Sequence, residues 1–279
     1  MSRPKAQFSS PSRLGGSENG LAYHIFNPSG TESVLLLHGA GTGAPEWNLV
    51  IPHFPQDYHL LVPDLPLHND SKNVGLRNIA KDTSNLLARL VTGESKGGQV
   101  HVVGLSLGAH VGRRLAVQHP AVVRSCLLSG YARLDFDWMP LALRNYVPHL
   151  IYGVEHLGLL IPKSWMDNIE HTDQTTTSHA FANFKKIWEM VIDEDMKEKP
   201  WGARTLMVAA TKGGLIPTND SVKDAQYLAE LGRKGNDDTS AVQNRKMRHA
   251  WNRQDPELFA EAAMCWIEST SLPAGFEPI

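Results

Sequence analysis

The sequence has only two cysteines and no excess of charge of either sign. Cys126 and Cys265 are too few for a disulfide framework, and because both lie in apolar runs we expect buried thiols in a reducing, cytoplasmic compartment. Lys plus Arg number 27 and Asp plus Glu number 29, which gives a formal net charge of −2. A chain so close to neutral offers no electrostatic reason to expect a nucleic acid or an anionic membrane as a partner.

Long apolar runs, internal repeats and metal-binding patterns are also missing. No stretch approaches the roughly 18 apolar residues that a membrane span requires, and the polar residues 1–18 do not resemble a secretory signal. The histidines show no H-E-x-x-H pattern, so we expect no metal site. With 279 residues, the chain has the length of one α/β domain, or of one domain with an insertion.

Short apolar runs alternate with helical patterns along most of the chain. Continuous apolar runs are typical of strands buried on both faces of a parallel sheet, and the stretches between them carry apolar residues at helical spacing. This alternation predicts right-handed crossovers and a mostly parallel sheet covered by helices on both faces. The predicted strands are residues 21–27, 33–39, 59–66, 99–106, 121–130, 203–211 and 241–247, and the predicted helices are residues 76–90, 107–119, 220–231 and 255–269.

The alternation stops between residues 131 and 200, where no strand pattern occurs and large apolar side chains are frequent. A segment of ~70 residues after one strand is too long for an ordinary connection. We therefore expect a helical lid, inserted into a core made of residues 1–130 and 201–279; the alternative is a run of ordinary helices that complete the core. The lid residues expected to contact an apolar substrate are Trp138, Trp165 and Trp188.

A G-x-S-x-G pattern stands between the strand predicted at 99–106 and the following helix. In this setting the pattern is a nucleophile elbow, in which small residues flank a serine on a strained turn. The turn presents the Ser106 hydroxyl at a helix N-terminus, where backbone N–H groups and the helix dipole favour a developing oxyanion. The alternative is a tight turn with an inert serine.

A glycine-rich turn, residues 38–43, follows the first buried run. It would let backbone N–H groups face the site, and the N–H groups of Ala40 and Leu107 would then form an oxyanion hole. Gly39 and Gly41 of the same turn are expected to contact the substrate. A phosphate-binding turn is less favoured, because neither the G-x-G-x-x-G spacing nor a P-loop lysine is present.

A histidine follows the last predicted strand, just before the terminal helix. A serine nucleophile requires a general base, and imidazole has a pKa suited to that role near neutral pH. The chain has 13 histidines, but His249 is distinguished by chain order, with the nucleophile first and the histidine last. We expect His249 to be the base.

Several stretches together resemble the α/β-hydrolase superfamily, in its lid-bearing branch of small-molecule serine hydrolases. The resemblance spans residues 20–270 and implies an eight-stranded, mainly parallel sheet, a Ser–acid–His triad and no cofactor. The matching stretches are LLLHGAGTG (35–43), LLVPDLPLHNDS (60–71), VVGLSLGAHVGRRLA (102–116), LMVAATKGGLIP (206–217) and RHAWNRQDPELF (248–259).

The chain departs from this family at the acid of the triad. The resemblance places that acid just after the strand at 203–211, where this sequence has Gly213. The acid could instead follow the preceding strand, as Asp135 or Asp137, and we expect Asp135 to bond a His249 ring nitrogen. It could also be Asp220, whose alternative role is a helix N-cap, or the site could work as a Ser–His dyad.

The sequence favours nucleophilic catalysis on an ester, thioester or lactone of an apolar small molecule, through an acyl-enzyme on Ser106. The same site could serve a cyclase, lactone-forming enzyme or isomerase if a group of the substrate replaces water as acceptor. A catalytically silent ligand receptor on the same fold is a second alternative. The sequence does not indicate the substrate's identity or the oligomeric state.

Overall fold

The computed structural model describes most of the chain outside the predicted lid. Asp135, Asp137, Trp138 and Trp165 lie outside the described residues, so the roles expected for them stay predictions. The described residues are 5–16, 20–71, 74–133, 146, 181–191, 196–213 and 220–279.

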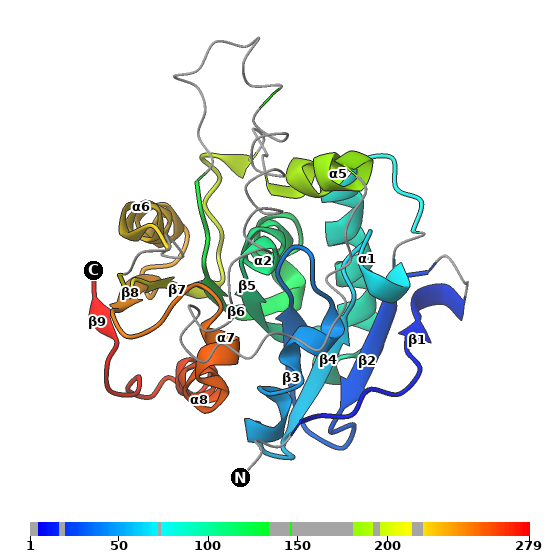
Figure 1. Ribbon diagram of the computed structural model, residues 1–279, viewed down its shortest axis with the longest axis horizontal. Coiled ribbons are helices and arrows are strands. Elements are labelled where there is room, and N and C mark those ends of the chain that lie inside the picture. The colour runs from blue at the N-terminus through cyan, green and yellow to red at the C-terminus, as the bar shows by residue number, and fades with distance from the viewer. Residues whose placement is uncertain are drawn as a thin grey trace.

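The described strands form one sheet in the order β1-β2-β4-β3-β5-β6-β7-β8-β9. From β4 to β8 every neighbouring pair is parallel, whereas the pairs at the two edges are antiparallel. Figure 1 shows this twisted sheet crossing the molecule. The strands are β1 (Ser12–Arg13), β2 (Ala22–Phe26), β3 (Glu32–Leu37), β4 (Tyr58–Pro63), β5 (Val100–Leu105), β6 (Val123–Ser129), β7 (Arg204–Ala210), β8 (Ser240–Asn244) and β9 (Glu277–Pro278).

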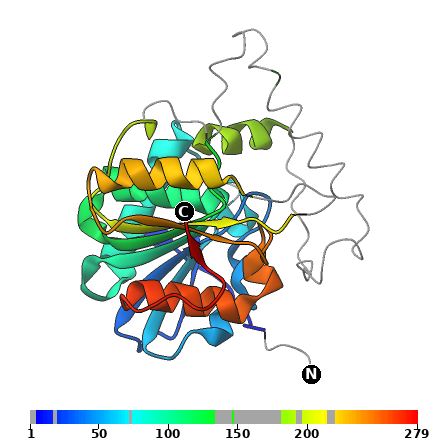
Figure 2. The same cartoon turned by 90° about the vertical axis from the view of Figure 1, so that its left-hand side faces the viewer.

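Helices cover both faces of the sheet, as Figure 2 shows with α6 on one side and α8 on the other. The α-helices are α1 (Ile79–Glu94), α2 (Leu107–Gln118), α5 (Phe181–Val191), α6 (Val222–Arg233), α7 (Trp251–Gln254) and α8 (Pro256–Ile267). The short 3-10 helices are η1 (Leu14–Gly16), η2 (Ala44–Trp47), η3 (Ile51–His53), η4 (Asn69–Ser71), η5 (Lys96–Gly98) and η6 (Pro120–Val122).

Two apolar cores lie on the two faces, and consecutive residues of a strand alternate between them. In β3, Leu35 and Leu37 pack into the core under α1, α2 and α6, while Val34 and Leu36 pack into the core with α8. All four are fully buried. A strand buried on both faces must be apolar throughout. The apolar residues of β3 are therefore consecutive in the sequence and do not alternate with polar ones.

The α/β-hydrolase fold predicted from the sequence is confirmed, with differences at the edges. The two-residue strands β1 and β9 extend the described sheet to nine strands, one more than the resemblance implied. Cys126 is buried, and burial raises its pKa to about 12, but Cys265 is only half-buried, so the expectation of two buried thiols was wrong for the second.

The segment expected to form a lid connects β6 to β7. Its described helix, α5, packs against α1 and α2, and Ile187 and Met190 join the apolar core that these helices share. The boundaries of the lid at residues 131 and 200 stay a prediction.

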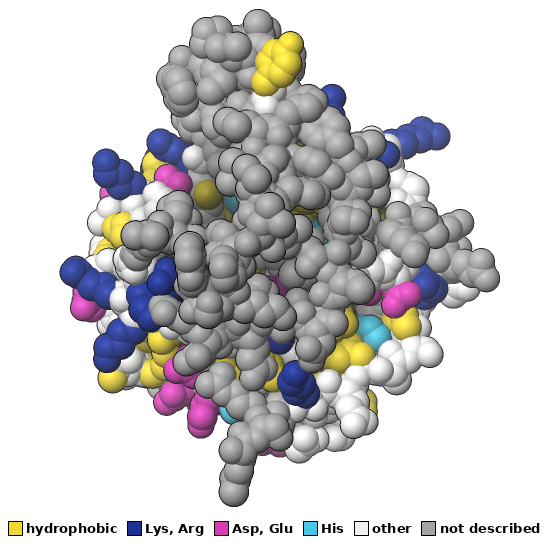
Figure 3. Space-filling model, in the orientation of Figure 1, with side chains coloured by type: hydrophobic (Ala, Val, Ile, Leu, Met, Phe, Trp, Pro, Cys, Tyr) yellow, Lys and Arg dark blue, Asp and Glu magenta, His cyan; other side chains and the backbone are white. Residues whose placement is uncertain are grey.

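Charged side chains of the described residues are spread over the surface. On the face drawn in Figure 3, the visible Lys and Arg side chains lie among Asp and Glu side chains rather than in a patch of one sign. This distribution agrees with the near-neutral net charge. None of the helices in the described ranges is long and apolar enough to cross a membrane.

The turn between β5 and α2 depends on glycine at two positions. A Cβ at Gly104 would lie 2.4 Å from the Gly108 carbonyl oxygen, and a Cβ at Gly108 would lie 2.0 Å from the Leu37 carbonyl oxygen. Both distances are far below van der Waals contact. The first turn of α2 therefore rests directly on the backbone at the end of β3, an approach that any side chain would block.

Gly108→Ala should lower the free energy of unfolding by about 3 kcal/mol or more, because the new methyl group would overlap backbone that cannot move aside. Gly93→Ala is the matched control, since it lies in α1 with open space around its would-be Cβ. That change should raise the stability by up to about 1 kcal/mol through helix propensity. Denaturant unfolding measures both, and equal stabilities for the two variants would contradict the close approach.

Candidate active site

Ser106 occupies a strained turn at the start of α2. Its backbone has φ 54° and ψ −115°, a conformation that non-glycine residues rarely adopt. The Ser106 N–H donates to the Ser129 carbonyl oxygen at 2.8 Å, which ties the turn to the end of β6. The side chain is half-buried at the carboxyl edge of the parallel strands, where ligands bind in sheets of this kind.

His249 lies in the loop between β8 and α7. Two residues later, Trp251 anchors this loop: its indole N–H donates to the Ser129 hydroxyl at 2.8 Å, and its side chain is fully buried. Gly130 makes room for the imidazole, because a Cβ there would lie 2.5 Å from His249 Cε1. The end of β6 therefore contacts Ser106 through a backbone hydrogen bond, and it contacts the loop that carries His249 through the side chain of Trp251.

Asp220 is the carboxylate beside His249. His249 Nδ1 and Asp220 Oδ1 are 2.5 Å apart, and the Asp220 side chain is 2% exposed. The other oxygen, Oδ2, accepts from the Ala210 N–H at 2.8 Å, while the Asp220 N–H donates to the Ala210 carbonyl oxygen at 2.9 Å. These two bonds hold Asp220 at the end of β7.

Among the acids that the sequence left open, Asp220 is the described partner of His249. Asp135 lies outside the described residues, so its expected bond to a His249 ring nitrogen stays a prediction. Asp220 is also not the N-cap of α6, because Ser221 fills that position and its hydroxyl accepts from the Asp224 N–H. Asp220 is the seventh residue after Gly213, and its bonds to Ala210 hold the carboxylate at the end of β7.

Burial disfavours the charged imidazole, but the Asp220 carboxylate and its hydrogen bond outweigh that effect and raise the pKa of His249 above its ordinary value. The more distant carboxylate of Glu46 acts in the same direction. An Nδ1 that donates to Asp220 leaves Nε2 as the free acceptor of the neutral ring. The ring is therefore oriented to take a proton on the side away from the acid.

A cavity of about 150 Å³ brings the predicted site residues together. Most of its lining is apolar, and the described part of the predicted lid contributes Trp188 to it. The lining residues are Ala40, Ser106, Leu107, His110, Gly130, Ala132, Ile187, Trp188, Val191 and His249.

The two backbone donors expected to form an oxyanion hole both belong to residues of this lining. Within the described part of the chain, neither the Ala40 N–H nor the Leu107 N–H has a hydrogen-bond acceptor. Gly39 and Gly41, which were expected to contact the substrate, are not in the lining. Their N–H groups donate to Glu46 Oε2 at 2.7 Å and to His68 Nε2 at 3.3 Å, respectively.

Glu46 is a site residue that no sequence pattern predicted, because nothing in the sequence distinguishes this glutamate of η2 from others. The side chain is buried, and its Oε2 accepts from both the Gly39 N–H and the Thr42 hydroxyl, at 2.7 and 2.8 Å. Oε1 accepts from Asn252 Nδ2 at 3.3 Å. The carboxylate therefore links the turn that carries Ala40 to the loop and helix that follow His249.

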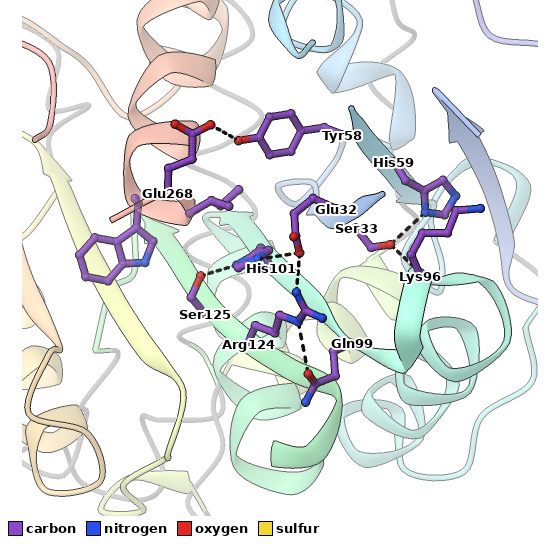
Figure 4. Close-up of polar contacts among 12 residues, drawn as sticks. Glu32, Ser33, Tyr58, His59, Lys96, Gln99, His101, Arg124, Ser125 and Glu268 are labelled. Atoms are coloured by element: carbon purple, nitrogen blue, oxygen red, sulfur yellow. Dashed lines mark hydrogen bonds and ion pairs between the residues drawn. The ribbon is translucent and has the colours of Figure 1, made fainter. Parts of the chain in front are cut away.

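Other histidines belong to a polar cluster at the opposite edge of the sheet, where the parallel strands begin (Figure 4). His101 bonds Ser125 Oγ at 2.7 Å and Glu32 Oε1 at 3.1 Å, and Arg124 pairs with the same Glu32 oxygen at 2.8 Å. Nearby, Ser33 Oγ lies 3.1 Å from His59 Nδ1. These contacts connect neighbouring strands, and no group of three or more potential metal ligands occurs among the described residues.

Comparison with known proteins agrees with this architecture. A family model described as the alpha/beta hydrolase family matches residues 34–262. An AB hydrolase superfamily protein of Gibberella zeae is 34% identical over 263 residues, which cover 94% of this chain and 89% of that protein.

Two further similarities extend over nearly the whole chain. The (E)-2-((N-methylformamido)methylene)succinate hydrolase of Acinetobacter baylyi is 23% identical over 274 residues, covering 90% of this chain and 96% of that protein. The crystal structure of MGS-M2, an alpha/beta hydrolase enzyme from a Medee basin deep-sea metagenome library, superposes with a TM-score of 0.67 at 16% identity, covering 94% of this chain and 99% of that one. The last comparison concerns the fold alone.

Removing either carboxylate should lower the pKa of His249. Asp220→Asn should have the larger effect, because it removes the direct hydrogen bond as well as the charge, and Glu46→Gln should have the smaller one. An NMR titration of the His249 ring measures this pKa. Glu277→Gln is the control, since Glu277 is exposed and pairs with Arg245. A His249 pKa that is the same in Asp220→Asn as in the wild type would contradict the pairing.

Proposed function

The chain belongs to the alpha/beta hydrolase family, and on that premise we propose that it is a serine hydrolase that cleaves an ester, thioester or lactone of a small molecule through an acyl-enzyme on Ser106. The observation that carries this proposal is the His249–Asp220 pair, at 2.5 Å, whose histidine lines the same cavity as a serine on a strained elbow. A nucleophile, a base and an orienting acid are the three groups that such chemistry requires.

In the first half of the reaction, neutral His249 accepts the Ser106 hydroxyl proton at Nε2 while Oγ attacks the substrate carbonyl carbon. The carbonyl oxygen becomes an oxyanion and accepts hydrogen bonds from the Ala40 and Leu107 N–H groups. The C–O or C–S bond then breaks, and the imidazolium returns its proton to the leaving group. Asp220 stabilises the imidazolium and keeps its Nδ1 proton in place.

In the second half, water replaces Ser106 as the nucleophile. His249 takes a proton from the water, the resulting hydroxide attacks the acyl carbon, and the Ser106 alkoxide leaves and recovers its proton from His249. The products are a carboxylic acid and free enzyme, so the cycle requires only water as a co-reactant.

The apolar lining of the cavity supports an apolar region in the substrate next to the scissile carbonyl. Ile187, Trp188 and Val191 of α5 face the same space as Leu107. We assign residues 131–200 the role of a lid that contributes these contacts. Of the three tryptophans expected to contact the substrate, Trp188 lies among the described residues and lines the cavity.

The cyclase alternative was favoured by the missing acid at Gly213. Asp220 beside His249 removes that reason, because the site then holds all the groups that hydrolysis by water requires. The receptor alternative is disfavoured because Ser106 and His249 share one cavity.

Ser106→Ala should lower kcat on a small ester by at least about 10³-fold, because the variant lacks the attacking oxygen. Ser269→Ala is the matched control: this serine also has a left-handed backbone, with φ 59°, but is exposed at the end of α8. Steady-state hydrolysis measures both variants. Near-normal turnover by Ser106→Ala would refute the covalent mechanism.

Asp220→Asn should lower kcat by about 10²- to 10⁴-fold with the fold intact, since the amide no longer stabilises the imidazolium. The exposed Asp237→Asn should leave kcat unchanged. In the wild type, kcat/KM should fall as the pH drops through the raised pKa of His249, because protonation removes the base. A pH–rate profile tests the direction of this change in kcat/KM. Full activity in Asp220→Asn would show that another residue acts as the acid.

A further inference from the structure

A buried carboxylate that the proposed reaction does not use lies behind the glycine-rich turn, residues 38–43. It belongs to Glu46 of η2, which directly follows the turn, and this residue is 4% exposed. The next residue, Trp47, is fully buried and packs on Phe259 with 5.4 Å between ring centroids, which fixes η2 to the core. Removal of a carboxylate from water is costly unless hydrogen bonds compensate it.

Three donors from two segments satisfy this carboxylate. On the side of the turn, Oε2 accepts from the buried Gly39 N–H at 2.7 Å and from the Thr42 hydroxyl at 2.8 Å. On the other side, Oε1 accepts from Nδ2 of Asn252, three residues after His249, at 3.3 Å. The two oxygens therefore hold two segments, and each segment carries a group of the proposed site.

Gly39 lies between this carboxylate and the proposed nucleophile. A Cβ built on Gly39 would be 3.6 Å from Ser106 Cβ and 3.7 Å from Glu46 Oε2. Gly39 is buried, whereas Ala40 is exposed and lines the same cavity as Ser106. The peptide group between these two residues therefore connects the buried carboxylate with the cavity.

That peptide group is held by its carbonyl oxygen. The Gly39 oxygen lies 2.8 Å from Thr42 Oγ1 and 2.8 Å from His38 Nδ1. His38 Nε2 accepts from the Leu65 N–H at 2.8 Å, so Nδ1 carries the ring proton and donates it to the Gly39 oxygen. The described peptide groups are all trans, and in a planar trans group the N–H points opposite to the C=O. Donors on the Gly39 oxygen thus set the direction of the Ala40 N–H.

Thr42 connects the carboxylate to this peptide group. Its hydroxyl oxygen lies 2.8 Å from both Glu46 Oε2 and the Gly39 oxygen, so one proton bridges a charged and a neutral acceptor. Glu46 therefore holds the N–H of Gly39 directly and the carbonyl of Gly39 through Thr42. With both ends of this residue held, the peptide group that follows it has one orientation.

We propose that Glu46 is a positioning residue for the oxyanion hole, which aims the Ala40 N–H at the substrate carbonyl oxygen by holding Gly39 and Thr42. The proposal rests on the serine hydrolase function proposed above. Donors of this kind lower a barrier only if they already point to the place where charge develops. Glu46 does not touch the substrate and acts through Ala40.

Loss of this carboxylate should lower kcat more than it changes KM, because the oxyanion exists in the transition state and not in the bound ester. Glu46→Ala should lower kcat by about 10- to 100-fold, a part of the 10²- to 10³-fold that removal of an oxyanion donor costs. KM should change by less than about 3-fold. Glu261→Ala is the matched control, because Glu261 is exposed on α8, and it should leave both constants at the wild-type values.

Glu46→Gln is the conservative variant. Its amide oxygen still accepts from Gly39 and Thr42, while its NH2 group faces Asn252. The Oδ1 atom of Asn252 has no hydrogen-bond partner within the described part of the chain, so an inverted Asn252 amide pairs with that NH2 group. Glu46→Gln should therefore recover most of the kcat that is lost in Glu46→Ala.

A pair of variants at Thr42 carries the same test if Glu46→Ala does not fold. Thr42→Val removes the bridging hydroxyl and keeps the shape of the side chain, so kcat should fall by about 3- to 30-fold. Thr42→Ser keeps the hydroxyl and should lose much less. Equal kcat values for Thr42→Val and Thr42→Ser would contradict the relay through this hydroxyl.

Inhibition by a trifluoromethyl ketone separates positioning from a merely structural role. Ser106 Oγ adds to the ketone carbon, the hydroxyl proton passes to His249, and the resulting alkoxide occupies the oxyanion position. Its inhibition constant should rise across the variants in proportion to the loss of kcat/KM. Concentrations are those of active sites titrated with a fluorophosphonate. A lower melting temperature of Glu46→Ala with an unchanged inhibition constant and kcat would overturn the proposal.

Amide hydrogen exchange, followed by NMR, tests the positioning without any substrate. The Gly39 N–H should exchange at least about 10-fold faster in Glu46→Ala than in the wild type, and much less so in Glu46→Gln. Equal exchange in all three would refute the role of Glu46. If esters are hydrolysed and Ser106 is labelled but Glu46→Ala keeps its kcat, the positioning role fails and the hydrolase function stands. If Ser106 is unlabelled and no ester reacts, the hydrolase function fails, and exchange alone decides whether Glu46 holds the turn.

Discussion

The close approach of the first turn of α2 to the end of β3 is the constraint on which the site depends. Gly108 brings the helix backbone against the Leu37 carbonyl, and Gly104 lets β5 pass beneath it. This contact fixes the left-handed conformation of Ser106 and places the Leu107 N–H beside the turn that carries Ala40. A looser approach would separate the two N–H groups, because the parallel strands below them allow little sideways movement.

The proposed acid, Asp220, contacts the end of β7 although it lies 10 positions after Ala210 in the sequence. Asp220 is not attached to the end of β7 by a short turn; it returns there, and both its backbone N–H and its carboxylate bond Ala210. The same carboxylate then orients His249 with its other oxygen. Three hydrogen bonds on one buried residue thus replace the short connection that the family resemblance led us to expect.

The sequence identifies the residues and strands whose role can be recognised from a short stretch of neighbouring residues. The elbow around Ser106 is a five-residue pattern, and the buried strands are continuous apolar runs, because their covering helices exclude water from both faces. The positions of Asp220 and Glu46 depend on contacts between distant segments, such as Asn252 with Glu46. Local patterns carry no information on such pairs, which is why the sequence left the partner of His249 open among several acids.

The central claim is that Ser106 becomes acylated, and rapid-quench mass spectrometry of the enzyme during turnover of a slow ester tests it most directly. Peptide mapping should find the acyl mass on the peptide that contains Ser106, with the adduct accumulating in Asp220→Asn or His249→Ala only at a strongly reduced rate. Acylation of a carboxylate or of another serine, with turnover intact and Ser106 unmodified, would contradict the account.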